Sequence, residues 1–465
     1  MEHSTMTNDD TICAISTPPG TGGIAVIRVS GPKAITICDT IWHGKRLSET
    51  PSHNARYGII VDPVNGELDR GLATVFRAPN SFTGEDVVEL SVHGSKWIQN
   101  ELVQLLIKQG CRMATEGEFT RRAFSSGRID LVEAEAIADM IASSSRASHH
   151  IAVSQMRGDL SNRLVDMREK LIELASLLEL ELDFSEEDVE FASRDKLLAL
   201  ARQTMDMMTK LTSTFSTGSA LKDGVPVAIV GETNAGKSTL LNKLLHEERA
   251  IVSDIHGTTR DTIEDTIEID GTLFRFIDTA GLRDTADPIE TIGIQRAHEK
   301  IRLARIILWV IDPTSTTDPA QTAADITSCM ATDAKLIAVI NKCDLDAPDI
   351  TPELTNLLPG ESKTIRISAS QNQGLDHLRT LIVDAAGFAR AHPGEIMLTN
   401  LRHFEALTNA TQSIARVITG LQTGLSGDFI AQDLRETLHY IGEITGSITT
   451  PQILSTIFSR FCIGK

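Results

Sequence analysis

The chain has 465 residues, a formal net charge of −19, 41% hydrophobic residues and only 4% aromatic residues. The length favours about three domains. No apolar run approaches the roughly 20 residues needed to span a bilayer, and no secretory leader opens the chain. We therefore expect a soluble, cytoplasmic protein with no membrane partner. Because affinity for RNA is dominated by phosphate neutralisation, so acidic a protein can contact RNA only locally or together with a partner.

Six cysteines are scattered along the chain without a C-x-x-C pair. This pattern indicates neither a zinc site nor a disulfide framework. Five of them are typical of small core or surface residues. Cys462 is the exception, because it lies three residues from the chain end in the segment FCIGK. That five-residue tail is short, and we do not expect it to carry any bundle core.

Residues 1 to about 125 predict an α+β domain, because strand-like runs alternate with Gly, Pro and Asn turns around one helix, WIQNELVQLLIKQG. The strand-like runs are TICAIST, GIAVIRVS, YGIIVD, LATVFRA and VVELSVHG. The segment PPGTGG resembles a phosphate loop, but it lacks the lysine and the following helix. We therefore predict a turn there.

From about residue 129 the spacing of apolar residues becomes helical. One stripe with alternating four- and three-residue steps comprises Leu160, Leu164, Met167, Leu171, Leu174 and Leu178. Helical spacing returns near the end with Ile430, Leu434, Leu438, Ile441 and Ile444. Neither half looks sufficient alone, so we predict one helical domain formed by residues 126–222 and 389–465, with residues 223–388 inserted as a separate domain.

The inserted segment begins with VPVAIVGETNAGKS, residues 225–238. A β-rich run precedes Gly231, and Gly236, Lys237 and Ser238 follow at the spacing of a phosphate-binding P-loop. Glycine-permissive backbone lets successive N–H groups wrap a polyphosphate, the lysine neutralises its outer oxygens, and the serine hydroxyl reaches Mg²⁺. The leucine-rich TLLNKLL supplies the required helix, so the chain is predicted to bind a nucleoside triphosphate.

Three further strand-like runs each end in a polar motif. The motifs are DTAG with Asp278 and Gly281, NKCD with Asn341, Lys342 and Asp344, and SAS with Ser368 and Ala369. Open parallel α/β sheets bind ligands outside the carboxyl ends of their strands. The Asp344 carboxylate can accept two hydrogen bonds from guanine, whereas adenine would leave it unpaired, a mismatch that discriminates by roughly 10⁴. The predicted ligand is GTP.

Ras-like switches orient the attacking water with a glutamine after the Asp-x-x-Gly segment, but this chain has Leu282 there. Another water-positioning group and another positive charge are needed. The amide oxygen of Asn234 suits an alkali ion, and K⁺ against the phosphates would replace an arginine finger, a role worth about 10³ to 10⁵ in rate. The loop at residues 253–261 would cover that ion. Alternatively, Asn234 caps its own turn.

The segment after the predicted γ-phosphate sensor, residues 282–297, carries the acids Asp284, Asp287 and Glu290. Each could act on the attacking water. Each could equally be a solvated charge at a helix start, where the helix dipole favours acids. The residues alone leave this choice open.

Taken together, GETNAGKS, SDIHGTTRD, DTAGLRDTADPIETIGIQRA, NKCD and FCIGK closely resemble the bacterial tRNA-modification GTPase family MnmE, also called TrmE. PPGTGGIAVIRVSG and PNSFTGEDVVEL extend the resemblance over the whole chain. It implies a folate-binding-like α+β domain at residues 1–125 that dimerises constitutively, an all-α domain at 126–222 and 389–465, and an inserted Ras-like α/β GTPase domain at 223–388.

The resemblance also implies roles for individual residues. It assigns K⁺ to Asn234, Ser253, Ile255 and Thr258, and Mg²⁺ to Ser238 and Thr259. Among the three acids it selects Glu290, which would activate water through an intervening water, alongside Lys237 on the phosphates. K⁺ would support association of the two GTPase domains. The complete predicted GTP set is Asn234, Ala235, Gly236, Lys237, Ser238, Thr239, Ser253, Thr259, Asp278, Gly281, Asn341, Lys342, Asp344, Ser368 and Ala369.

In the N-terminal domain the resemblance implies that a tetrahydrofolate one-carbon donor contacts Arg28, Glu89, Arg128 and Lys465. The donor would be 5,10-methylene-tetrahydrofolate, with 5-formyl-tetrahydrofolate as an analogue. From the residues alone, Arg28 is as well explained as a strand-end charge and Glu89 as an exposed strand residue. The family pattern has lysine at position 128, and arginine keeps the charge but alters the donor geometry.

The implied function is GTP hydrolysis coupled to aminomethyl-type addition at carbon 5 of the tRNA wobble uridine, by a homodimer working with an FAD-dependent MnmG (GidA)-like partner. Cys462 is a candidate nucleophile, since thiolate attack on uracil is reasonable chemistry. The rival is an Era-like RNA-binding ribosome-assembly factor, whose G-x-x-G turn is spelled by residues 424–427. No Lys or Arg follows that turn until Arg435, so a helix-to-helix connection is favoured.

Overall fold

The chain in the computed structural model divides into two compact units. The structure describes residues 10–183, 194–246, 265–277, 298–316, 318–387, 395–459, 461, 463 and 464. The first unit comprises Met1–Ala138, Gln155–Leu197 and Arg416–Lys465, and the second comprises Asp139–Ser154 and Leu198–Ala415. The fold combines an α+β N-terminal part, a helical part and an α/β part, as predicted. None of the helices in the described ranges is long and apolar enough to cross a membrane.

A seven-stranded sheet with the order β3-β4-β5-β6-β2-β1-β7 forms the N-terminal part. Its strands are β1 (Ile12–Ile15), β2 (Ile24–Ser30), β3 (Trp42–His43), β4 (Asn54–Asp62), β5 (Gly66–Phe76), β6 (Val87–His93) and β7 (Arg112–Met113). Alternate strand residues pack against helices α1 (Ala34–Ile41) and α2 (Lys96–Lys108) in one hydrophobic cluster. The predicted strands and helix are confirmed, and PPGTGG lies in the connection between β1 and β2, as expected for a turn.

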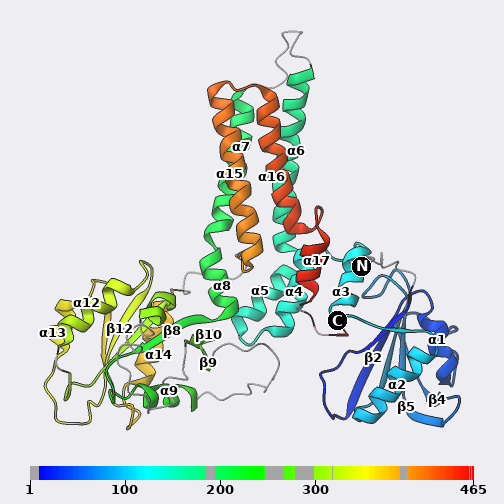
Figure 1. The fold of residues 1–465 in the computed structure, drawn as a ribbon, viewed down its shortest axis with the longest axis horizontal. Coiled ribbons are helices and arrows are strands. Elements are labelled where there is room, and N and C mark those ends of the chain that lie inside the picture. The colour runs from blue at the N-terminus through cyan, green and yellow to red at the C-terminus, as the bar shows by residue number, and fades with distance from the viewer. Residues whose placement is uncertain are drawn as a thin grey trace. The chain divides into compact units, whose positions relative to one another are not determined.

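Besides α1 and α2, the first unit contains α3 (Glu118–Ser125), α4 (Leu131–Ala142, which runs into the second unit), α6 (Asp159–Asp183), α16 (Gly427–Thr445) and α17 (Pro451–Phe458). Helix α6 packs against α16, although the two are far apart in sequence (Figure 1). All six predicted stripe residues of α6 are buried, as are four of the five on α16; Leu438 is half-buried. This packing brings together helical segments from before and after the inserted residues, while a single helical domain with the bounds 126–222 and 389–465 stays a prediction.

The chain end contradicts one expectation. Phe461 is only 6% exposed and packs in a cluster with Leu131, Ile457 and Phe458. Residue Ile463 forms a β-bridge with Glu116, and Ser16 Oγ donates a hydrogen bond to the Gly464 carbonyl at 3.1 Å. The tail therefore does contribute to a core, because its aromatic ring fills space between α4 and α17 that the bundle stripes do not reach.

The second unit contains a six-stranded sheet with the order β13-β12-β11-β8-β10-β9. Its strands are β8 (Val225–Val230), β9 (Asp265–Ile269), β10 (Thr272–Phe276), β11 (Ile306–Ile311), β12 (Lys335–Ile340) and β13 (Lys363–Arg366). Only β9 pairs antiparallel. Because both faces of β11 and β12 are covered, these strands are continuous apolar runs whose alternate residues enter two separate core clusters.

The helices of this unit include α9 (Lys237–His246), α12 (Pro319–Cys329), α13 (Thr351–Leu357) and α14 (Leu375–Ala386) of the α/β part, together with α5 (Arg146–Met156), α7 (Arg194–Ser213), α8 (Phe215–Asp223) and α15 (Leu401–Thr423). Helices α7 and α15 each extend into the first unit. The G-x-x-G segment at residues 424–427 joins α15 to α16, so the predicted helix-to-helix connection is confirmed.

Candidate guanine-nucleotide site

The loop after β8 has a backbone that only glycine fits at two positions. Gly231 has φ 144°, and a Cβ there would lie 2.1 Å from the Val310 carbonyl oxygen. Gly236 has φ 96°, and a Cβ there would lie 2.2 Å from Asn341 Nδ2. Helix α9 then begins at Lys237. This strand, glycine loop and helix N-terminus is the arrangement in which backbone N–H groups and the helix dipole favour a phosphate.

Lys237 folds back over the same loop. Its ammonium donates to the carbonyl oxygens of Gly231 at 2.8 Å and Glu232 at 2.6 Å. Burial lowers the pKa of Lys237, and the charge of Lys300 lowers it further. Phosphate oxygens are stronger, charged acceptors than neutral carbonyls, so a triphosphate in this loop would compete effectively for the ammonium.

Asn341 joins three of the predicted motifs. Its side chain is buried at 3% exposure, Nδ2 donates to the Ala235 carbonyl at 2.9 Å, and Oδ1 accepts from the Ala369 N–H at 3.0 Å. One amide thus links the P-loop, the NKCD segment and the SAS segment. Both ends of this amide are satisfied, which makes the link geometrically specific.

Lys342 is paired with a residue that the sequence analysis missed. Its ammonium lies 2.6 Å from Asp312 Oδ2, and Asp312 is 4% exposed at the end of β11. Burial alone would raise the pKa of Asp312, but hydrogen bonds from Lys342 and Thr314 outweigh burial and lower it to about 2. The available signal was an acid directly after the apolar run IILWVI, at the same strand end as the other motifs.

The remaining predicted nucleotide residues divide into two groups. Ser238 and Thr239 lie in the first turn of α9, Asp344 is exposed at the strand end, and buried Ser368 accepts a hydrogen bond from the Gln371 N–H at 3.2 Å. The residues Ser253, Ile255, Thr258, Thr259, Asp278, Gly281 and Glu290, and also Cys462 and Lys465 of the tail, lie outside the described residues.

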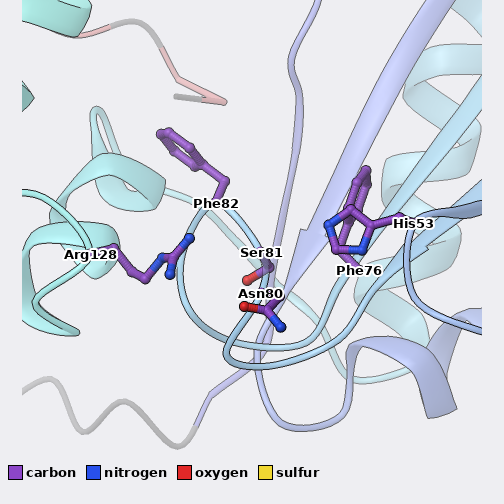
Figure 2. Close-up of a pocket in the computed structure, with 6 residues that line it drawn as sticks. All are labelled: His53, Phe76, Asn80, Ser81, Phe82 and Arg128. Carbon is purple, nitrogen blue, oxygen red and sulfur yellow. The ribbon is translucent and has the colours of Figure 1, made fainter. Parts of the chain in front are cut away.

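The candidate folate residues of the N-terminal sheet lie near one another. Arg28 and Glu89 face each other across β2 and β6, with Arg28 Nε and Nη2 at 2.9 and 2.7 Å from Glu89 Oε1. The Arg28 guanidinium also lies 5.3 Å from the centre of the Phe82 ring. Phe82 and Arg128 line a cavity of about 520 Å³ (Figure 2). Its other lining residues are His53, Phe76, Asn80 and Ser81.

A second charged cluster in this part is structural in character. Glu118 is 1% exposed and accepts hydrogen bonds from Arg112 at 2.6 Å, Arg122 at 3.0 Å and the Thr115 N–H at 2.8 Å. Burial alone would raise the pKa of Glu118, but these donors outweigh it and lower the pKa to about 2. A buried carboxylate with three donors ties α3 to β7 and to the loop between them.

Because the folded-state pKa of Glu118 is below its unfolded value, its ionised form stabilises the fold above about pH 4.5, and this contribution is lost as the pH falls toward 2. We expect Glu118→Gln to lower the free energy of unfolding by roughly 2–3 kcal/mol at neutral pH, with the difference from wild type shrinking below pH 4.5. Urea unfolding across that range measures it. Glu67→Gln, in an exposed pair with Arg70, is the control and should show a small difference throughout.

The glycine loop, the buried Asn341 link and the exposed Asp344 at one edge of a mainly parallel sheet define a P-loop GTPase. Comparison with known families agrees. The chain matches the MnmE helical domain over residues 131–462 and the N-terminus of the GTP-binding protein TrmE over residues 11–128.

Two curated relatives are tRNA modification GTPases MnmE. The protein from Parabacteroides distasonis is 49% identical over 460 residues and that from Bacteroides thetaiotaomicron is 50% identical over 468 residues; each alignment covers 98% of this chain and 100% of the relative. A solved GTP-binding protein from Sulfolobus solfataricus in complex with GDP matches 48% of this chain and 67% of its own at 21% identity, with a TM-score of 0.28 that adds no weight. The chain belongs to the MnmE family of tRNA modification GTPases, and it is a GTP hydrolase.

Proposed function

We propose that this chain is a K⁺-activated GTPase which, with an FAD-dependent MnmG-like partner, adds an aminomethyl-type group to carbon 5 of the tRNA wobble uridine. The carbon comes from 5,10-methylene-tetrahydrofolate, and the protein acts as a cytoplasmic homodimer. The observation that carries this proposal is the sequence identity of 49–50% with tRNA modification GTPases, over 98% of the chain. Hydrolysis of GTP is common to many proteins, but a resemblance that includes the N-terminal and helical parts argues for the tRNA reaction as well.

The position of Asn234 supports the K⁺ site. Asn234 is an exposed residue of the P-loop with φ 64°, a left-handed conformation that asparagine adopts more readily than other residues with side chains. Its amide forms no hydrogen bond with any residue in the described part of the chain, so no self-capping turn is found there. The amide oxygen of Asn234 is a hard ligand that suits an alkali ion. Held by Asn234, Ser253, Ile255 and Thr258, that ion would supply positive charge to the developing transition state.

The Mg²⁺ assignment rests on the same helix start. Ser238 follows the phosphate-binding lysine in the first turn of α9, where a hydroxyl oxygen can reach a cation bridging the phosphates. Thr259 would supply the second hydroxyl.

The cavity beside Phe82 supports the folate donor. Its volume of about 520 Å³ is within the usual range for small-ligand sites, and its lining combines aromatic rings with Arg128, a mixture that suits a flat heterocycle carrying carboxylates. The stacking of Arg28 on Phe82 links the Arg28–Glu89 pair to the cavity wall. Lys465 would complete this set from the chain end.

The tail tests the tRNA reaction separately from GTP hydrolysis. Truncating residues 461–465 would remove buried Phe461, and loss of a buried aromatic ring costs about 3–5 kcal/mol, so point substitutions are the better test. We expect Cys462→Ser and Lys465→Met each to preserve GTP hydrolysis within about twofold and to abolish wobble modification in cells. Mass spectrometry of wobble nucleosides from a strain carrying each variant measures modification. Phe461→Leu is the control for packing.

Three outcomes separate the alternatives. Intact modification in both variants would refute a functional role for Cys462 and Lys465. Joint loss of hydrolysis and modification with a lowered melting temperature would show that the tail is structural. If a strain that lacks the whole chain still carries the same wobble-uridine modification as wild type, that result would instead favour the ribosome-assembly factor.

A further inference from the structure

Asp312 lies at the carboxyl edge of the GTPase sheet, where the predicted base site is. Strands β11 and β12 run parallel with Ile311 opposite Ile340, and the Asn341 N–H donates to the Ile311 carbonyl at 2.8 Å. Asp312 therefore follows β11 directly beside the NKCD segment. Its side chain is buried, in contrast to exposed Asp344 in the same region.

The Asp312 carboxylate is held in place by its own turn. Oδ1 accepts from the Thr314 N–H at 3.0 Å and from Thr314 Oγ1 at 2.7 Å. The Asp312 carbonyl also accepts from the N–H groups of Ser315 and Thr316 at 3.2 and 3.1 Å. Such a turn orients an aspartate independently of other elements. The second oxygen, Oδ2, is therefore a fixed acceptor, and Lys342 is the flexible partner that it holds.

Lys342 is held at both ends. Its backbone has φ 60°, a strained left-handed conformation for a side-chain-bearing residue, and the adjacent Cys343 N–H donates to the Ile367 carbonyl at 3.0 Å. Its ammonium is 2.6 Å from Asp312 Oδ2. A lysine that is held at both ends keeps its alkyl stem in one place. Lys342 belongs to the same NKCD segment as Asp344, so its stem is fixed close to that residue in the chain.

The two lysines of the site therefore have different tasks. The Lys237 ammonium lies on the carbonyls of the P-loop, where phosphates would bind. The Lys342 ammonium is neutralised by a buried carboxylate and is not offered to phosphate. The Lys342 side chain as a whole is 32% exposed. With the head group bound to Asp312, its hydrocarbon stem is the part that could cover the face of a flat base.

We propose that Asp312 is a positioning residue for guanine recognition, because it anchors the Lys342 ammonium so that the lysine stem forms one wall of the base site beside Asp344. This rests on the proposed placement of guanine against Asp344. Lysine carries substantial rotamer entropy, and fixing it before the nucleotide arrives reduces the ordering cost of binding. The wall contacts the base, so its effect is the same for GDP and GTP.

The test is fluorescent-nucleotide titration of the full-length protein. We expect Asp312→Ala to lower the affinities for GDP and for GTP by a similar factor of about tenfold. The kcat at saturating GTP should stay within about twofold of wild type. Asp318→Ala is the matched control: Asp318 lies in the same connection but accepts from the Gln321 N–H at 2.9 Å and caps α12 instead. It should leave both affinities within about twofold. If Asp312→Ala does not fold, Asp312→Asn is the alternative, because it keeps the shape of the side chain and removes its charge. It should lower the affinities for both GDP and GTP.

A double-mutant cycle shows whether Asp312 acts through Lys342. Lys342→Met keeps an unbranched apolar stem and removes the ammonium, so Asp312→Ala should add little further loss in that background. Full additivity, or unchanged nucleotide affinity in Asp312→Ala, would overturn the positioning role. Asp344→Asn tests the underlying placement of the base, because it should lower the affinity for GTP and raise the affinity for xanthosine triphosphate. Failure of that exchange would show that the guanine placement is wrong, whereas success of the exchange without an effect at Asp312 would refute the positioning role alone.

Discussion

Replacing Glu290 by alanine is expected to lower kcat for GTP hydrolysis by about 10² or more while leaving GTP affinity nearly intact, the usual result of removing a positioned general base. The chemical reason is the residue after the DTAG motif. Leu282 stands where Ras-like switches have the glutamine that orients water, so another residue must orient and activate the nucleophile. Glu290 is an acid in the following segment and is the one that the family pattern selects. Turnover at saturating GTP and titration with a fluorescent nucleotide separate the two effects.

Asp284 and Asp287 provide matched controls, because they are acids of the same segment. Their alanine variants should retain kcat within about threefold. A large loss of turnover in one of these variants and not in Glu290→Ala would assign the base to that residue instead. Weakened GTP binding with normal turnover in Glu290→Ala would mean that this segment contacts the nucleotide and does not activate water.

GTP hydrolysis is expected to be roughly tenfold or more faster in K⁺ than in Na⁺, since the proposed cation would take the place of an arginine finger, a charge that is worth about 10³ to 10⁵ in rate. Na⁺ has a smaller radius and would fit a site built for K⁺ poorly. Asn234→Ala should remove most of the difference by lowering the rate in K⁺ to near that in Na⁺. Steady-state rates in matched chloride salts at constant ionic strength measure the effect.

An exposed asparagine on α9 offers the control for this cation experiment. Asn242→Ala changes the same residue type outside the P-loop, and it should keep the full preference for K⁺. Equal rates in the two salts for the wild-type protein would remove K⁺ from the mechanism. A persistent preference in Asn234→Ala would place the cation elsewhere.

The sequence by itself determined the features that are written locally. The P-loop requires glycine at two backbone positions and a lysine at fixed spacing, so Gly231, Gly236 and Lys237 could be recognised before any contact was known. Strand ends could be aligned because parallel sheets present them at one edge. The buried stripes of α6 and α16 followed from helical periodicity alone, since a helix repeats its core-facing side every 3.6 residues.

Only the tertiary structure decided which distant groups meet. Asp312 is an ordinary acid after a strand until parallel pairing of β11 with β12 sets it beside Lys342. Arg28 could be read as a strand-end charge until antiparallel register put Glu89 directly across from it. Phe461 looked like part of a terminal tail, yet it fills a core next to α4 and α17. Pairing energies depend on separation and burial, and both are set by the packing of segments far apart in the chain.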